Sequence, residues 1–264
     1  KYYIDPLIMI TIILAGGKGS RLGSTTKKIP KPMVKIGKEP ILLHVMNIYQ
    51  KYNYNRFIIC TGYLHNKIKN FFDLRSSSQK KIIFNKKKYI EYSSKKEGWT
   101  VVLNYTGLNS MTGERIKRSK NLIDYYELEN FMLTYGDGVG SINIKKLINS
   151  HKKSKKIATI TAVKPPPRFG ALTIKNNNVI NFSEKKIKDN AWINGGFFVL
   201  NKKIFNFIKG KNTSWEQKPL EKLAKHLHLN AYKHENFWQP MDTIKDKNQL
   251  TELCIKHNNL LNIK

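Results

Sequence analysis

The stretch Leu14-Ala15-Gly16-Gly17-Lys18-Gly19-Ser20-Arg21-Leu22 directly follows an apolar run, Ile8 to Leu14, that has the length and composition of a buried strand. Open α/β sheets bind ligands at this end of their strands. The three glycines let the backbone approach a bulky anion, successive N–H groups can surround its oxygens, and Lys18 and Arg21 add positive charge. The stretch therefore predicts a phosphate-binding loop after a buried strand.

Two well-known phosphate motifs do not describe this loop. No Gly-Lys-Ser/Thr closes a four-residue gap, which excludes a P-loop. Leu22 stands where the dinucleotide fingerprint has its third glycine. A tight turn without a ligand is the structural alternative, because glycine also permits close packing. Phosphate binding is the favoured interpretation.

A second short motif, Pro30-Lys31-Pro32-Met33, places one lysine between two prolines. Each proline fixes φ and removes a backbone donor, so the flanks of Lys31 are rigid. Rigid flanks indicate a lysine that is aimed at a ligand. A surface lysine in a loop fits the same spacing, and the motif alone does not decide between the two.

Beyond these motifs, apolar runs of strand length alternate with helical patterns, which is typical of a parallel α/β sheet. Residues Gly16 to Lys31 are too rich in Gly, Lys, Thr and Ser for regular structure. The basic runs Lys80–Lys96 and Lys152–Lys156 are expected in connections or helix ends. Further strands are expected at Arg56–Cys60, Val101–Leu103, Phe131–Tyr135, Ile157–Val163 and Phe197–Leu200, with a hairpin of Ala171–Ile174 and Val179–Phe182. Helices are expected at Pro40–Tyr52, Asn66–Phe72, Glu114–Asn121, Ile144–Lys152, Lys202–Ile208, Pro219–His228 and Asp246–Asn258.

The charge of the chain is strongly positive. Its 264 residues include 48 Lys and Arg against 18 Asp and Glu, a net charge of +30. With 40% hydrophobic residues the chain still has enough apolar material for a folded core. Such a charge can serve binding to nucleic acid or an anionic membrane. A lysine-rich, solvated surface is the favoured alternative, because no nucleic-acid module is recognisable.

Cysteine usage and hydropathy narrow the class of protein further. Cys60 and Cys254 are too few for a disulfide scaffold or a four-thiolate zinc site, which favours buried free thiols in a reducing, cytoplasmic compartment. No apolar run reaches the roughly 18 residues that span a bilayer, and no membrane partner is expected. Leu7 to Ala15 has the character of a signal-peptide core, but Asp5 and Pro6 interrupt its flank, which favours a buried strand.

The two motifs above, in this order, resemble the signature of the sugar nucleotidyltransferases, the pyrophosphorylases that make NDP-sugars. Further segments extend the resemblance over essentially the whole chain from Ile10, and their combination is specific, whereas one segment alone would be weak. The set is most similar to the members that make CDP-glucose. The segments are Thr106-Gly107 through Ser110-Met111-Thr112-Gly113, Tyr135-Gly136-Asp137-Gly138, Arg168-Phe169-Gly170-Ala171-Leu172, Phe182-Ser183-Glu184-Lys185, Trp192 to Phe198 and Phe237 to Thr243.

The resemblance implies one nucleotidyltransferase domain over residues 1–264, with a nucleotide-binding half at 8–140 and a sugar-phosphate-binding half with C-terminal helices at 141–264. The implied fold is a Rossmann-like mixed, mainly parallel sheet with helices on both faces and a small β-rich sugar-binding portion. In the implied reaction an oxygen of glucose 1-phosphate attacks the α-phosphorus of CTP in line, and pyrophosphate leaves. A homo-oligomer with small-molecule substrates and no nucleic-acid partner is also implied.

The resemblance also assigns roles to individual residues. Asp137 and Asp242 would hold Mg²⁺, which prefers one or two carboxylates plus phosphate oxygens and water; a turn or capping aspartate is the structural alternative for each. Arg21 and Lys31 would be catalytic, Arg21 by balancing charge on the departing pyrophosphate and Lys31 at the α-phosphate. The nucleotide would be bound by Leu14, Ala15, Gly16, Gly17, Lys18, Gly19, Ser20, Arg21, Lys31, Ser110 and Arg115, and the sugar phosphate by Glu184, Lys185, Asn194 and Gly195.

Three positions depart from the family pattern. Ser20 replaces a threonine and keeps the hydroxyl, Glu114 stands where a second glycine is expected, and Lys186 replaces a proline after Glu184-Lys185. None of the three removes a proposed metal ligand, so an active enzyme is expected. The competing readings are a sugar nucleotidyltransferase that uses UTP or dTTP, a basic nucleic-acid or anionic-surface binding protein, and an inactive relative that serves as a sensor or scaffold.

Overall fold

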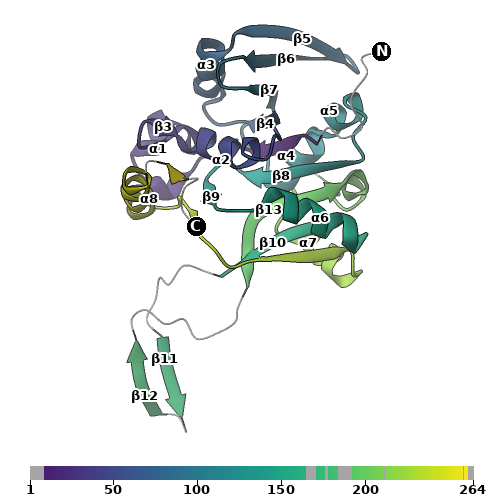
Figure 1. The fold of residues 1–264 in the computed structure, drawn as a ribbon. Coiled ribbons are helices and arrows are strands. Elements are labelled where there is room, and N and C mark those ends of the chain that lie inside the picture. Colours follow the sequence, from purple (N-terminus) through teal and green to yellow (C-terminus); the bar gives the residue numbers. More distant parts are fainter. Residues whose placement is uncertain are drawn as a thin grey trace.

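The computed structural model describes residues 9–164, 171–175, 178–183, 192–210, 212–257 and 259–260. Its largest element is a nine-stranded sheet in the order β14-β10-β13-β8-β1-β4-β7-β6-β5 (Figure 1). In this sheet β13 and β6 run antiparallel to their neighbours, and the other seven strands share one direction. The mixed, mainly parallel sheet expected from the sequence is confirmed. Its strands are β1 (Thr11–Leu14), β4 (Arg56–Thr61), β5 (Ser78–Phe84), β6 (Lys87–Ser94), β7 (Trp99–Tyr105), β8 (Asn130–Tyr135), β10 (Ala158–Val163), β13 (Ile193–Asn201) and β14 (Leu229–His234).

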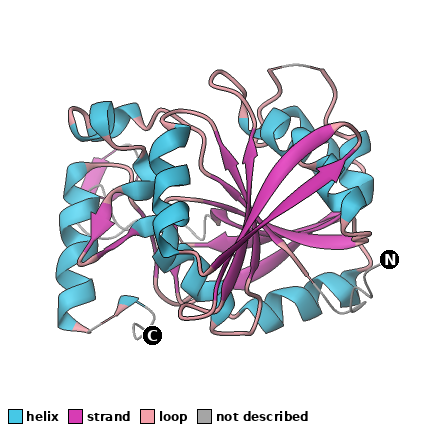
Figure 2. Cartoon of the chain, turned by 90° about the horizontal axis from the view of Figure 1, so that it is seen from above, coloured by secondary structure: helices cyan, strands magenta, loops and turns pink. Residues whose placement is uncertain are grey.

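Helices cover both faces of the sheet (Figure 2). Side chains of a strand alternate between faces, so Ile13 and Ile12 belong to different buried clusters. The Ile13 cluster packs under α2 (Ile41–Gln50), α3 (His65–Arg75), α6 (Ile144–Ser154) and α8 (Ile244–Lys256), and the Ile12 cluster under α4 (Thr112–Arg118), α5 (Lys120–Tyr125) and α7 (Lys218–Lys225). Because β1 is buried on both faces, its sequence is a continuous apolar run. Within the described ranges, no helix is long and apolar enough to cross a membrane.

Three small antiparallel pairs accompany the main sheet. β11 (Ala171–Lys175) and β12 (Asn178–Ser183) form the expected hairpin, whose turn residues lie outside the described part of the chain. β2 (Lys35–Ile36) pairs with β3 (Glu39–Pro40). β9 (Gly138–Gly140) pairs with β15 (Trp238–Pro240), and neither of these strands was expected from the sequence. The nine-stranded sheet takes strands from both predicted halves of the chain.

The basic run Lys80–Lys96 is not a connection, so that prediction is wrong. It makes most of the hairpin β5–β6, which closes one end of the sheet. Ile82 and Tyr92 are buried, whereas Lys80 and Lys81 are exposed on the outermost strand. Lysines on an edge strand oppose pairing with another chain. Because charged residues separate the few apolar residues of this run, its composition does not reveal the strands.

Local helix boundaries also differ from expectation. Ser20–Leu22 is a 3₁₀ turn and Thr25–Lys28 a short helix, α1, inside the segment expected to be irregular. The helix expected at Glu114–Asn121 is divided at Ser119, whose hydroxyl bonds the Arg115 carbonyl in the preceding turn. The helix expected at Lys202–Ile208 is a 3₁₀ helix, Lys202–Asn206.

A buried histidine connects α6 to the sheet. His151 is 5% exposed, and its Nδ1 lies 3.0 Å from Thr159 Oγ1 and its Nε2 3.3 Å from Asn130 Oδ1. Burial lowers the pKa of His151 to about 4. Since an unfolded histidine titrates near 6.5, the unfolded chain binds this proton first as the pH falls.

We therefore expect the free energy of unfolding to fall between about pH 6.5 and pH 4, with His151 contributing up to ~3 kcal/mol of the loss. Urea unfolding at pH 7, 5.5 and 4 measures this slope. His151→Gln removes the titrating ring and should flatten it. His226→Gln, at an exposed position, is the matched control and should leave the slope as in the wild type. An unchanged slope in His151→Gln would contradict the assignment.

Candidate active site

A cavity of about 640 Å³ opens at the sheet edge where β1 and β8 end and β13 begins. Most residues expected to bind the nucleotide line it, together with side chains from four other parts of the chain. Lys18 does not line it, although the rest of its loop does. The lining residues are Leu14, Ala15, Gly16, Gly17, Gly19, Ser20, Arg21, Lys31, Pro32, Ser110, Met111, Thr112, Arg115, Tyr135, Gly136, Asp137, Asn194, Ser214, Glu216, Trp238, Pro240 and Asp242.

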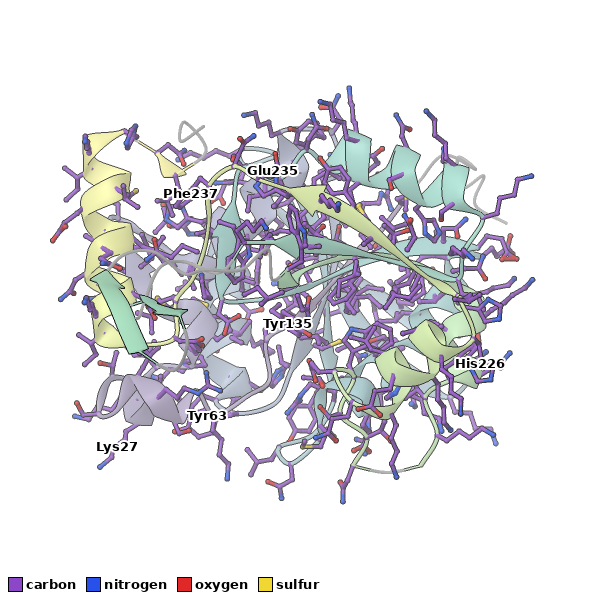
Figure 3. The ribbon with its side chains drawn as sticks, turned by 90° about the horizontal axis from the view of Figure 1, so that it is seen from below. Lys27, Tyr63, Tyr135, His226, Glu235 and Phe237 are labelled. Atoms are coloured by element: carbon purple, nitrogen blue, oxygen red, sulfur yellow. The ribbon has the colours of Figure 1, made fainter. Side chains whose placement is uncertain are left out.

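The glycine loop is shaped for close approach. Gly19 has φ 64°, and a Cβ there would lie 2.8 Å from Lys31 Cβ, so both its conformation and its surroundings require glycine. Within the described part of the chain, the N–H groups of Gly17 and Lys18 have no acceptor. Outside the loop, the Tyr63 hydroxyl donates a hydrogen bond to the Lys27 carbonyl oxygen at 3.2 Å. Both residues are labelled in Figure 3. The loop thus presents backbone donors on a fixed backbone, as an anion site needs.

Lys31 lies at the centre of the site. Residues Lys31–Met33 form a 3₁₀ turn in which Met33 N donates to Pro30 O at 2.8 Å. The Lys31 side chain is 12% exposed, and its Nζ lies 2.6 Å from Asp137 Oδ2 and 2.8 Å from Asp242 Oδ1. Burial alone would lower the pKa of Lys31, but the two carboxylates outweigh it and the pKa is raised. The turn between the two prolines directs this ammonium group into the cavity.

Strand pairing brings the two aspartates together. Trp238, Gln239 and Pro240 pair with Gly140, Val139 and Gly138, and the ladder continues as Met241 N donates to Asp137 O at 2.8 Å. Asp242 then follows one residue later, beside Asp137. Arg21 adds a longer contact, with its Nη1 3.4 Å from Asp242 Oδ2. Two carboxylates far apart in the sequence thus share one cation.

This carboxylate pair fits a magnesium ion. Both Asp137 and Asp242 reach a single positive charge, and Mg²⁺ binds through one or two carboxylates plus phosphate oxygens and water. Among the residues that the structure describes, no group of three or more His, Cys, Asp or Glu could hold a metal. In the arrangement that Mg²⁺ prefers, substrate and water supply the ligands beyond such a carboxylate pair.

Arg115 is a loop anchor in this structure. It is 3% exposed, and its Nη1 donates to Thr61 O (3.2 Å), Thr106 Oγ1 (2.7 Å) and Gly107 O (2.9 Å), while its Nη2 donates to Gly16 O (2.9 Å) and Leu108 O (3.4 Å). A Cβ at Gly16 would lie 2.1 Å from Arg115 Nη1. The guanidinium therefore acts on the nucleotide site by holding the glycine loop in place.

Glu114 and Ser110, two residues near Arg115, also have partners within the protein. The Glu114 carboxylate does not face the cavity, because it pairs with Arg118 at 2.6 Å. Burial opposes ionisation of Glu114, but hydrogen bonding and charge from Arg118 outweigh it and lower its pKa. The Ser110 hydroxyl donates to the Thr106 carbonyl at 2.5 Å. The departure at Glu114 thus leaves the cavity free of its side chain.

The expected sugar-phosphate residues are described only in part, since Glu184 and Lys185 lie outside the described residues. Asn194 lines the main cavity, and Gly195 lines an adjoining hollow beside it. A Cβ at Gly195 would lie 2.7 Å from a methyl of Val163, so glycine is required there. Trp238 donates from Nε1 to Gly195 O at 2.7 Å. β15 therefore connects the part of the cavity around Gly195 with the carboxylate pair.

Similarity to known proteins assigns the chain to a family. The nucleotidyl transferase family profile matches residues 10–245. The chain belongs to the nucleotidyl transferase family. The glucose-1-phosphate cytidylyltransferase of Salmonella typhimurium is 44% identical over 250 residues, 94% of this chain and 96% of its own length, and the probable glucose-1-phosphate cytidylyltransferase of Bacillus subtilis is 40% identical over 90% and 93%.

Two solved structures share the fold of this chain. A putative glucose-1-phosphate thymidylyltransferase from Bacillus anthracis superposes with a TM-score of 0.68 at 19% identity, covering 97% of this chain and 96% of its own. HddC from Yersinia pseudotuberculosis superposes with a TM-score of 0.64 at 25% identity, covering 93% and 99%. The Rossmann-like fold of nucleotide-sugar transferases is therefore confirmed for this nucleotidyltransferase.

The sequence analysis assigned no role to two residues of the cavity wall, Tyr135 and Glu216. Tyr135 lies near the centre of Figure 3, and its hydroxyl donates to Glu216 Oε1 at 2.6 Å. Thr112 donates to Glu216 Oε2 at 2.7 Å, as does Ser214 at 2.6 Å. Tyr135 belongs to a motif in which only Asp137 was assigned a role. Glu216 has no motif around it, and only its position among uncharged residues of an acid-poor chain could have marked it.

The Arg115 assignment predicts a loss of stability. Arg115→Met removes the donor to the Gly107 carbonyl and one of two donors to the Gly16 carbonyl, which keeps its bond from Tyr63 N. We expect the free energy of unfolding to fall by about 3 kcal/mol and nucleotide binding to weaken with it. Urea unfolding and nucleotide titration measure the two effects. Lys117→Met, at an exposed position of the same helix, is the control and should change neither. A stable Arg115→Met that loses only nucleotide affinity would instead indicate direct contact with the nucleotide.

Proposed function

We propose that this chain is a glucose-1-phosphate cytidylyltransferase, which joins CTP and glucose 1-phosphate to give CDP-glucose and pyrophosphate. The observation that carries the proposal is the Lys31 ammonium held between Asp137 and Asp242 beside a glycine loop with free backbone donors. Two polyanions must meet in this reaction, so positive charge is needed where the phosphates lie. The choice of CTP and glucose 1-phosphate rests on the two relatives that are 40% and 44% identical over most of the chain.

In this proposal the chain contributes placement and charge. The N–H groups after β1 hold the triphosphate, Lys31 neutralises charge at the α-phosphate, and Arg21 stabilises the departing pyrophosphate. Mg²⁺, when bound by Asp137 and Asp242, supplies charge stabilisation on phosphate oxygens. Asn194 and Gly195, with Glu184 and Lys185, hold the sugar phosphate. The homo-oligomeric state stays a prediction from the resemblance, and the cytoplasmic location stays a prediction from the cysteine usage.

A substrate panel tests the proposal. Purified chain is incubated with Mg²⁺, glucose 1-phosphate and each of CTP, UTP, dTTP, GTP and ATP, and released pyrophosphate is measured. We expect CTP to give the highest kcat/KM. Equal or higher turnover with UTP or dTTP would overturn the cytidylyl assignment, and tight, salt-sensitive binding of arbitrary DNA without turnover would favour a nucleic-acid binder instead.

The carboxylate pair gives a second prediction. Asp137→Asn removes one negative charge next to Lys31, and we expect kcat to fall at least about a thousandfold because metal binding and α-phosphate neutralisation both suffer. Calorimetry of Mg²⁺–CTP binding provides a readout that does not depend on turnover and should show a matching loss. Asp124→Asn, exposed on α5, is the control for an unrelated carboxylate and should keep wild-type activity. Near-normal kcat in Asp137→Asn would remove this residue from the site.

A further inference from the structure

One carboxylate in the cavity wall is not used by the proposed reaction. The described wall contains three acidic side chains, and two of them, Asp137 and Asp242, share Lys31. The third, Glu216, makes no ion pair in the part of the chain that the structure describes. It accepts hydrogen bonds from Tyr135, Thr112 and Ser214 instead. In a chain with a net charge of +30, an acidic group without a cationic partner in a phosphate-binding cavity calls for an explanation.

The three hydroxyl groups fix the position of Glu216. The 2.6 Å bond from Tyr135 reaches Oε1, and the bonds from Ser214 and Thr112 reach Oε2. An exposed carboxylate held by three donors keeps a defined direction, and in its ionised form it can only accept further hydrogen bonds.

The loop that carries Glu216 is anchored in the core. Trp215 is fully buried, its ring lies 5.6 Å from Phe198, and its backbone N–H donates to Thr112 Oγ1 at 2.9 Å. Glu114 N donates to Thr213 O at 3.3 Å, which ties the same loop to the first turn of α4. Glu216 is thus part of a preorganised wall.

The negative charge of Glu216 limits which part of a substrate can lie opposite it. A carboxylate repels phosphate, so the part of the substrates opposite Glu216 must be uncharged and must carry hydrogen-bond donors. CTP differs from UTP and dTTP at position 4 of the ring, where cytosine has an amino donor and the other two have an oxygen acceptor. Within the described wall, Glu216 is the one acceptor-only side chain that is not engaged with Lys31. Its chemistry matches one feature that separates cytosine from uracil and thymine, the 4-amino donor.

We propose that Glu216 is the specificity-determining residue for the base: its carboxylate accepts a hydrogen bond from the 4-amino group of cytosine and repels the 4-oxo group of uracil or thymine. Tyr135, Thr112 and Ser214 are positioning residues that act through Glu216. This inference rests on the proposed function, because it presumes that CTP is the preferred nucleotide. It adds a residue that reads the base to a site otherwise built around phosphates and metal.

The test is the ratio of kcat/KM for CTP to that for UTP, both measured with glucose 1-phosphate and Mg²⁺. Glu216→Gln keeps the size of the side chain but replaces one oxygen by an amide donor that suits a 4-oxo group. We expect the ratio to fall at least about tenfold, with part of the change coming from faster use of UTP. Tyr135→Phe removes one positioning hydroxyl and should lower the ratio by a smaller factor. Glu221→Gln, exposed on α7, is the matched control and should keep the wild-type ratio.

The outcomes separate this inference from the proposed function. If the wild type prefers UTP or dTTP, the proposed function itself fails. If the wild type prefers CTP and Glu216→Gln keeps the same CTP-to-UTP ratio, Glu216 does not read the base. A rise of KM for glucose 1-phosphate with an unchanged nucleotide ratio would place the carboxylate opposite the sugar hydroxyls and overturn the inference as well. A folded variant is shown in each case by an unchanged circular dichroism spectrum and melting temperature.

Discussion

The contact of Lys31 with both Asp137 and Asp242 is the constraint on which the rest of the site depends. Two carboxylates placed side by side by β9 and β15 would repel each other in a half-buried setting. One ammonium group between them removes that repulsion and connects the segment after the glycine loop to both strands. Three features bring Lys31 next to the two aspartates. They are the strand pairing, the proline-flanked turn, and the glycine at position 19, which makes room for the lysine side chain.

The fold was predictable where burial leaves a simple pattern. β1, β4 and β8 are covered on both faces, so each appears as a short apolar run. The hairpin β5–β6 was missed because it has a single buried face and lysines on the other, a composition that equally describes a solvated loop. β15 was missed for another reason: three residues around Trp238 form a strand only because Gly138–Gly140 lies beside them, a pairing that no local pattern contains.

The same distinction holds in the site. Residues within short motifs, such as the glycine loop and Lys31, were predicted to lie together, and they line one cavity. The direction of a cation could not be predicted: Arg115 and Lys31 are both basic, yet one points into carbonyl groups and the other toward carboxylates. Glu216 was not predicted because its partners Thr112 and Tyr135 come from separate segments, and their meeting depends on how a loop packs around Trp215.

The charge balance of the cavity indicates how the net charge of +30 can act. The described wall contains three basic residues, Arg21, Lys31 and Arg115, and three acidic ones, Asp137, Asp242 and Glu216, so its formal side-chain charge cancels. Arg115 is moreover committed to carbonyl groups. Attraction for two polyanionic substrates must then come from backbone N–H groups, from a bound divalent ion and from the field of the whole protein. Lysines far from the site, including those on the edge strand β5, contribute to that field without touching a substrate. The excess charge therefore favours the encounter with anionic substrates, whereas the balanced wall leaves recognition to hydrogen-bond geometry.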